Sequence, residues 1–128
     1  MDRTLITAPS LPDTSDGGFS HAVRVGNLLF LSGQSGAHPD HSQPSEDFET
    51  QTRRAFAKMQ AVLEAAGGSL ANLVTMTVFI TDRSYSAEFR RLRVEILQRD
   101  FPASALIGVS ALGRPDVLLE IQATAVLD

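Results

Sequence analysis

The chain contains no cysteine and no tryptophan, only one tyrosine, and no hydrophobic run of membrane-spanning length. The absence of cysteine excludes disulfides, thiolate metal sites and a cysteine nucleophile. No stretch reaches the ~20 apolar residues that a helix needs to cross a bilayer, and the first residues lack the apolar centre of a signal peptide. We therefore expect a cytoplasmic protein with no membrane association.

Positive charge is also scarce. The net charge of -4 argues against binding to a phosphate backbone, and a single tyrosine offers no platform on which bases could stack. A nucleic-acid partner is therefore not expected. The length of 128 residues, with 43% hydrophobic and 20% charged residues, is typical of one globular domain spanning residues 1–128.

The spacing of apolar residues predicts the element order β-β-α-β-α-β-β after an irregular leader over residues 1–18. Strands are predicted at Ala22–Val25, Leu28–Leu31 and Leu73–Thr81, and two more flank the turn Leu112–Asp116; helices are predicted at Phe48–Ala66 and about Ser84–Gln98. Gly26-Asn27 is typical of a hairpin turn, and Gly67-Gly68 of a helix stop. The second helix carries the apolar residues Phe89, Leu92, Val94, Ile96 and Leu97.

These elements predict an α+β domain in which both helices cover one face of a mixed sheet. On the last strand Leu119, Ile121 and Ala123 share one side, whereas Glu120 and Gln122 share the other. The helices can bury the first side. We therefore expect neighbouring subunits to cover part of the second, with Glu120 and Gln122 lining a cleft there.

Four phrases, FSHAVRVGNLLFLSGQ, LEAAGGSLANLV, TVFITD and FPAS…LIGVSAL…LLEIQATAV, together resemble the Rid family, also called YjgF/YER057c/UK114. The likeness extends from about Phe19 to Val126. It implies a chorismate-mutase-like subunit and a homotrimer with clefts between subunits. It also implies hydrolysis of small enamine or imine acids to 2-keto acids and ammonia, without a metal or other cofactor.

The residues that the resemblance places in the cleft are Phe19, Ser32, Gly33, Arg90, Ser104, Leu106 and Glu120. Glu120 and the Ser32-Gly33 pair retain the family pattern. Four positions depart from it: Phe19 replaces a tyrosine, Arg90 an asparagine, Leu106 a cysteine, and Ser104 the arginine that grips the substrate carboxylate. Serine can donate a hydrogen bond but supplies no charge, so standard deaminase activity on 2-aminoacrylate is doubtful.

Two interpretations of Glu120 remain open. The carboxylate can position and deprotonate the attacking water, or it can be a partly buried acid satisfied by backbone amides or by an arginine. Arg90 has the same ambiguity. It can replace the missing arginine, or it can belong with Arg91 and Arg93 to the solvated face of a helix. Arg24 and Arg114 are weaker candidates for this charge.

His21 and Gln34 are further candidates for the border of the cleft, although a lone strand histidine is usually a packed residue. His38 and His41 lie in a polar loop without a third fixed ligand, so no metal site is expected. Ser35 lacks the spacing of a nucleophile elbow, which argues against a serine hydrolase.

Three classes of function follow. The first is cofactor-free hydrolysis of reactive small metabolites, which Glu120 favours. The second is a trimer that binds a small ligand or a protein without catalysis, which Ser104 favours. The third is RNA cleavage or inhibition of translation, which the negative net charge disfavours.

Overall fold

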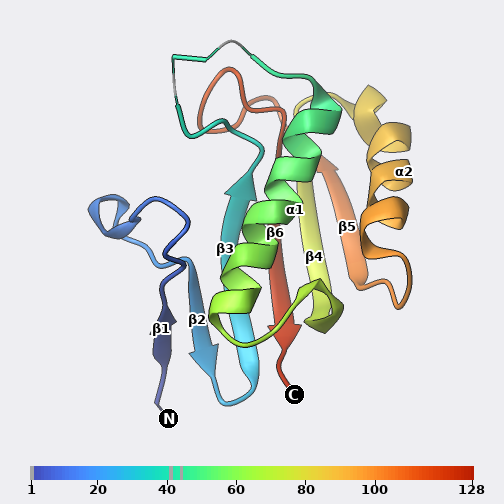
Figure 1. Ribbon diagram of the computed structural model, residues 1–128. Helices are drawn as coiled ribbons and strands as arrows, with labels where there is room; N and C mark the ends of the chain where they lie inside the picture. The colour runs from blue at the N-terminus through green and yellow to red at the C-terminus, as the bar shows by residue number, and fades with distance from the viewer. Residues whose placement is uncertain (1, 41, 44) are drawn as a thin grey trace.

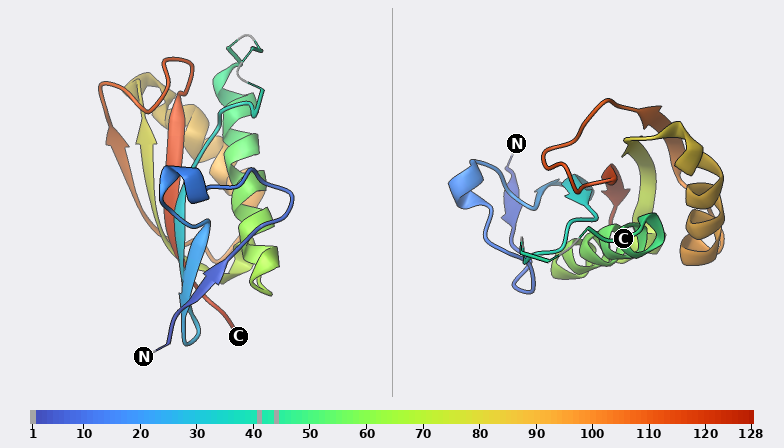
Figure 2. Two further views of the ribbon diagram at one scale, coloured as in Figure 1. Left: turned by 90° about the vertical axis from the view of Figure 1, so that its left-hand side faces the viewer. Right: turned by 90° about the horizontal axis from the view of Figure 1, so that it is seen from above.

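The computed structural model describes residues 2–40, 42–43 and 45–128 and shows one six-stranded sheet with two helices on one face (Figures 1 and 2). The strands are β1 (Thr4–Ile6), β2 (Ala22–Val25), β3 (Leu28–Ser35), β4 (Leu73–Ile80), β5 (Ala103–Gly108) and β6 (Leu119–Val126). The helices are α1 (Phe48–Ala65) and α2 (Ser86–Leu97). The predicted α+β class is confirmed.

The spatial order of the strands is β1-β2-β3-β6-β4-β5. Only β4 and β5 pair in parallel; all other neighbours are antiparallel, so the sheet is mixed as predicted. β6 closes the chain by inserting between β3 and β4. Both helices act as crossovers, because α1 connects β3 to β4 across β6 and α2 connects β4 to its neighbour β5.

The prediction that residues 1–18 are irregular is wrong in two places. Thr4–Ile6 forms β1, which pairs with β2 through Leu5 and Val23, and Ser15–Gly17 forms a short 3-10 helix. A three-residue strand has too few positions to show an alternating pattern, and its extended shape depends on pairing with β2. The observed order therefore has one strand more than predicted.

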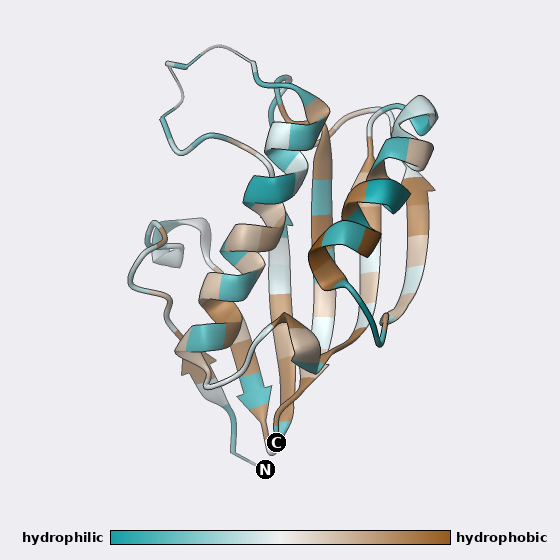
Figure 3. Cartoon of the chain, turned by 45° about the vertical axis from the view of Figure 1, so that its right-hand side comes forward, coloured by the Kyte–Doolittle hydropathy of each residue, from teal (hydrophilic) through white to brown (hydrophobic). Residues whose placement is uncertain are grey.

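The core lies between the sheet and the two helices. Helix α1 buries Ala55, Phe56 and Met59, and the ring of Phe56 stacks at 6.2 Å from that of Phe89 on α2. Polar residues gather on the outward surfaces of both helices (Figure 3). Asp47 caps α1 by accepting a hydrogen bond from the amide of Thr50, and the helix ends just before Gly67, whose φ of 87° needs glycine. No helix among the described residues is long and apolar enough to cross a membrane.

Helix α2 is shorter than predicted, since residues 83–85 form a separate 3-10 turn and Gln98 has a φ of 70°. Within α2 only Phe89 and Leu92 are buried, whereas Val94 is 54% exposed. The packing of α2 against the sheet uses a narrower stripe than its apolar residues suggested.

The last strand alternates as predicted, with Leu119, Ile121 and Ala123 buried and the intervening residues less so. None of the helices in the described part of the chain lies on the opposite face of the sheet (Figure 2). Phe30 and Ile107 are 45% and 42% exposed there. One face of the sheet is thus packed, and the other is open and partly apolar.

Candidate functional site

A cavity of about 280 Å³ lies beside the second half of β3. β2 pairs only with residues 28–31, so residues 32–35 have no strand neighbour on that side. The segment that leads into β2 bounds the resulting gap. The cavity is lined by Leu11, Pro12, Thr14, Phe19, His21, Gly33, Gln34, Ser35, Lys58 and Glu120. Its size suits a small metabolite.

Glu120 reaches this cavity past Gly33. A Cβ atom at position 33 would lie 2.3 Å from Oε1 of Glu120, closer than two such atoms can approach. β3 contains a bulge between Leu31 and Gln34, which places Ser35 opposite Glu120 in the ladder to β6. The absence of a side chain at Gly33 therefore creates the space that the Glu120 carboxylate occupies.

Gly33→Ala is expected to displace the Glu120 carboxylate while the protein stays folded, since a flexible carboxylate can move more easily than backbone. Misplacing a catalytic group by about 1 Å can lower turnover by about 10²-fold. Gly18→Ala is the control for turnover, because a Cβ at Gly18 would meet no neighbour within 4 Å. Its φ of 78° makes some loss of stability expected there. Unchanged turnover in Gly33→Ala would show that the position of Glu120 is unimportant.

Ser32 and His21 join β3 to the segment before β2. The Ser32 hydroxyl donates to the carbonyl of Ser20, and its amide donates to the carbonyl of His21 at 3.0 Å. His21 is only 6% exposed, yet its Nδ1 has no hydrogen-bond partner among the described residues. Buried polar atoms are usually paired, so this nitrogen is an exception within the wall of the cavity.

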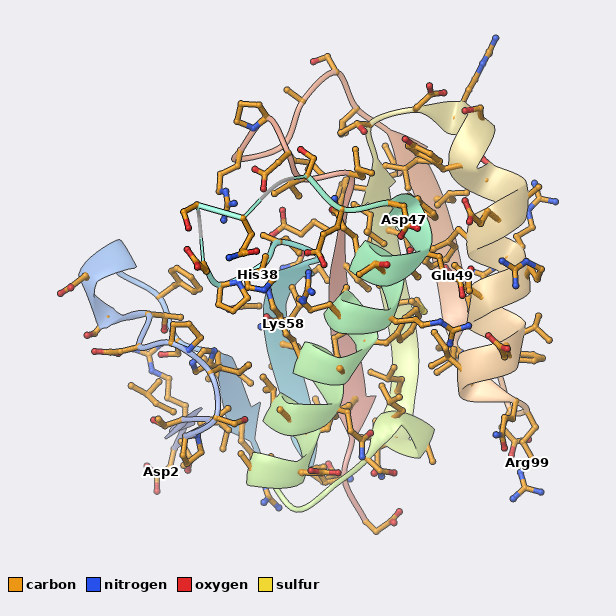
Figure 4. The ribbon with its side chains drawn as sticks, turned by 45° about the horizontal axis from the view of Figure 1, so that its top comes forward. Asp2, His38, Asp47, Glu49, Lys58 and Arg99 are labelled. Atoms are coloured by element: carbon orange, nitrogen blue, oxygen red, sulfur yellow. The ribbon has the colours of Figure 1, made fainter. Side chains whose placement is uncertain are left out.

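Lys58 is the only lysine in the chain, and it enters the cavity from α1 (Figure 4). Its Nζ donates to the carbonyls of Ser35 and Ala37, each at 3.1 Å. The chain leaves β3 at this point, and Lys58 therefore holds its amine at a defined place beside the cavity. Periodicity did not single out Lys58 as a site residue, because a lysine on a helix is usually solvated.

Two arginines near Lys58 are already paired. Arg54 forms a bidentate ion pair with Glu46, and Arg114 forms one with Asp116 at 2.6 and 3.0 Å. Lys58 forms no ion pair within the described residues. Burial lowers the pKa of Lys58, the positive charges of Arg54 and Arg114 lower it further, and Glu120 opposes that shift.

The second group of predicted cleft residues lies on β5 and α2, away from this cavity. Ser104 shares the helix-covered side of the sheet with its partner Met76, and its hydroxyl accepts a hydrogen bond from Nη1 of Arg93 at 2.9 Å. Arg93 also lies over the ring of Phe89. A guanidinium from α2 therefore stands beside Ser104, a contact that the basic run at 90–93 did not reveal.

Arg90 is exposed one turn before Arg93, and Leu106 packs partly against the core. Neither Arg90, Ser104 nor Leu106 lines the cavity that contains Glu120. One chain thus brings together Phe19, Ser32, Gly33 and Glu120, together with His21 and Gln34, but not the residues on α2 and β5. Strand order explains this separation, because β6 and β4 lie between β3 and β5.

The remaining candidates have other surroundings. Gln122 is exposed in a separate hollow on the open face, beside Phe30 and Thr124. Arg24 donates to the carbonyl of Gly26. Nδ1 of His38 accepts a hydrogen bond from the amide of Asp40, while His41 lies outside the described residues. Among the described residues, no three histidine or acidic side chains converge as they would around a metal ion.

Comparison with known proteins decides the family. Residues 10–127 match the family model described as Endoribonuclease L-PSP. The crystal structure of a Mycobacterium tuberculosis member of the YjgF/YER057c/UK114 family superposes with a TM-score of 0.85 at 29% identity, covering 98% of this chain and all of that one. The chain belongs to this family. The Rid resemblance of the four sequence phrases is thereby confirmed.

Two curated members of the Rid family are informative relatives. A RutC family protein of Pyrococcus horikoshii is 36% identical over 110 residues, which cover 85% of this chain and 86% of that protein. A 2-iminobutanoate/2-iminopropanoate deaminase of Dermatophagoides farinae is 29% identical over 127 residues, covering 98% of both chains. Rid family members thus include a protein named for imine deamination.

Proposed function

We propose that this Rid family protein hydrolyses small enamine or imine metabolites in the cavity that contains Glu120. The observation that carries the proposal is the placement of Glu120, a carboxylate that reaches a metabolite-sized cavity only because position 33 is glycine. The relative named as an imine deaminase supports the same chemistry.

In this proposal, Glu120 takes a proton from water as the water oxygen forms a bond to the imine carbon. Glu120 gives this proton to the nitrogen as the carbon–nitrogen double bond becomes single, which leaves a carbon that carries one hydroxyl and one amino group. Glu120 then takes the hydroxyl proton and passes it to the nitrogen, the carbon–nitrogen bond breaks, and ammonia leaves while the hydroxyl oxygen becomes a carbonyl. The reaction consumes one water and yields one carbonyl compound and one ammonia.

The complete cleft is proposed to lie between copies of the chain in a homotrimer. Two observations support this assembly: the cleft residues implied by the Rid resemblance fall into two separate groups, and the open face of the sheet exposes apolar side chains such as Phe30. A second copy could present its α2 and β5 residues to the cavity of the first. Burial of exposed apolar surface would favour such assembly.

The test couples a pyridoxal-dependent threonine dehydratase to the purified protein and follows the released imine by absorbance. We expect the wild type to accelerate the loss of imine. Ser104→Arg runs in parallel, with the exposed Ser84→Arg as a control for added charge. If Ser104→Arg alone is active, the cleft is intact, and either the natural substrate lacks that carboxylate or the natural role is binding, the alternative that the uncharged Ser104 favours.

A further inference from the structure

The proposed function brings two negative charges into one cavity. A 2-imino acid carries a carboxylate, and Glu120 already places one negative charge at the cavity wall. Two anions in a partly desolvated space repel each other unless a cation compensates. The charge at the position of the usual family arginine is missing from the sequence, since Ser104 stands there.

Among the described residues, Lys58 is the only lysine or arginine that lines this cavity. An ammonium has three N–H donors, and Lys58 uses two of them on the carbonyls of Ser35 and Ala37. Its partners are neutral, whereas the neighbouring Arg54 and Arg114 are neutralised by carboxylates. Lys58 therefore has no carboxylate partner among the described residues and one N–H donor left for an external anion.

His21 also lines the cavity and is 6% exposed. Its Nδ1 lacks a partner among the described residues, but this atom is itself buried and is not open to a ligand in the cavity. Lys58 therefore provides the cation in the cavity that Glu120 enters.

We propose that Lys58 binds the carboxylate of the substrate in place of the arginine that is missing at position 104. This proposal rests on the proposed function, but it concerns binding and can fail separately. Arg93 on α2 is the competing cation, because its guanidinium contacts Ser104.

The experiment measures selectivity for charge by titrating 2-oxobutanoate and its neutral analogue 2-oxobutanamide into wild type, Lys58→Gln and Arg93→Gln. A charge-assisted hydrogen bond should make the wild type bind the carboxylate about 10- to 100-fold more tightly than the amide. Lys58→Gln is expected to reduce this preference to about 1-fold while amide binding persists. Arg93→Gln is expected to retain it. A purely structural role for Lys58 would weaken both ligands equally.

A measurement on the wild type covers the case in which Lys58→Gln fails to fold. Because Lys58 is the only lysine, protein labelled with ¹³C at the lysine ε-carbon gives one lysine resonance. 2-Oxobutanoate should raise the pKa of Lys58, and the amide should not, since an opposite charge favours the ammonium. The other charged groups that act on this amine are Arg54, Arg114 and Glu120, and His21 also lines the cavity.

Three results would overturn the proposal. They are retained selectivity in folded Lys58→Gln, selectivity lost only in Arg93→Gln, and absence of wild-type binding to 2-oxobutanoate together with an unchanged lysine resonance. Imine turnover that is equal in wild type and Lys58→Gln would remove the role of Lys58 while leaving the proposed hydrolysis intact. Selective binding without turnover would remove the proposed hydrolysis while leaving the role of Lys58 intact.

Discussion

Glu120→Gln is expected to lower imine turnover by about 10²- to 10⁴-fold, the usual contribution of a general base. Glutamine preserves the shape of the side chain and its ability to hydrogen-bond, but it cannot accept the proton of the attacking water. Stopped-flow absorbance in the coupled dehydratase assay would measure the loss. Circular dichroism would establish that the variant is folded.

Glu64→Gln is the matched control, since Glu64 lies near the end of α1 and does not line the cavity. It should leave turnover unchanged. A second readout does not depend on activity: removing the charge of Glu120 should lower the pKa of Lys58 further, because Glu120 raises it in the wild type. Full turnover in folded Glu120→Gln would mean that this acid is a structural group in the strand.

Gln51→Leu should cause a large loss of stability, about 3 kcal/mol or more in the free energy of unfolding. Gln51 is 2% exposed, and its side chain serves three backbone groups in different segments. Its Nε2 donates to the carbonyls of Glu46 and Asp116, and its Oε1 accepts the amide of Leu118. Leucine would remove these three hydrogen bonds and leave the backbone groups without partners, but it would not leave a large void.

Gln60→Leu is the control for the same chemical change. Gln60 is half-buried on α1, and its side chain accepts a hydrogen bond from one backbone group, the amide of Leu70. The expected loss in the free energy of unfolding is therefore about 1 kcal/mol. Urea denaturation at one protein concentration would compare the two, because any assembly makes stability depend on concentration. Equal losses would contradict the view that Gln51 locks α1 to the start of β6.

Local patterns predicted the elements whose burial depends on their own sequence. The apolar stripe from Phe48 to Leu63 became α1, and Gly26-Asn27 became the turn of the β2–β3 hairpin. Alternation about Glu120 correctly placed its neighbours in the core. These predictions are correct because the helix and strand periods alone determine which side chains share a face.

The pairing of distant segments explains most of what those patterns missed. Leu5 is 62% exposed, so β1 has no apolar alternation to reveal it, and only its register with β2 makes it a strand. The contact of Arg93 with Ser104 depends on how α2 packs over β5. The spacing of polar residues predicts which side of a helix is polar, but it does not predict which strand that side will contact.

By itself, the sequence determined the α+β class, the family and the presence of one acid in a strand that is otherwise core. Only the tertiary structure decided what surrounds that acid. A bulge and a glycine in β3 bring Glu120 from one side of the sheet to the same cavity as Lys58 from α1. The physical reason is that the interaction between two charges depends on their separation in space and not on their separation in the sequence. Residues 33, 58 and 120 become neighbours only when β6 inserts beside β3.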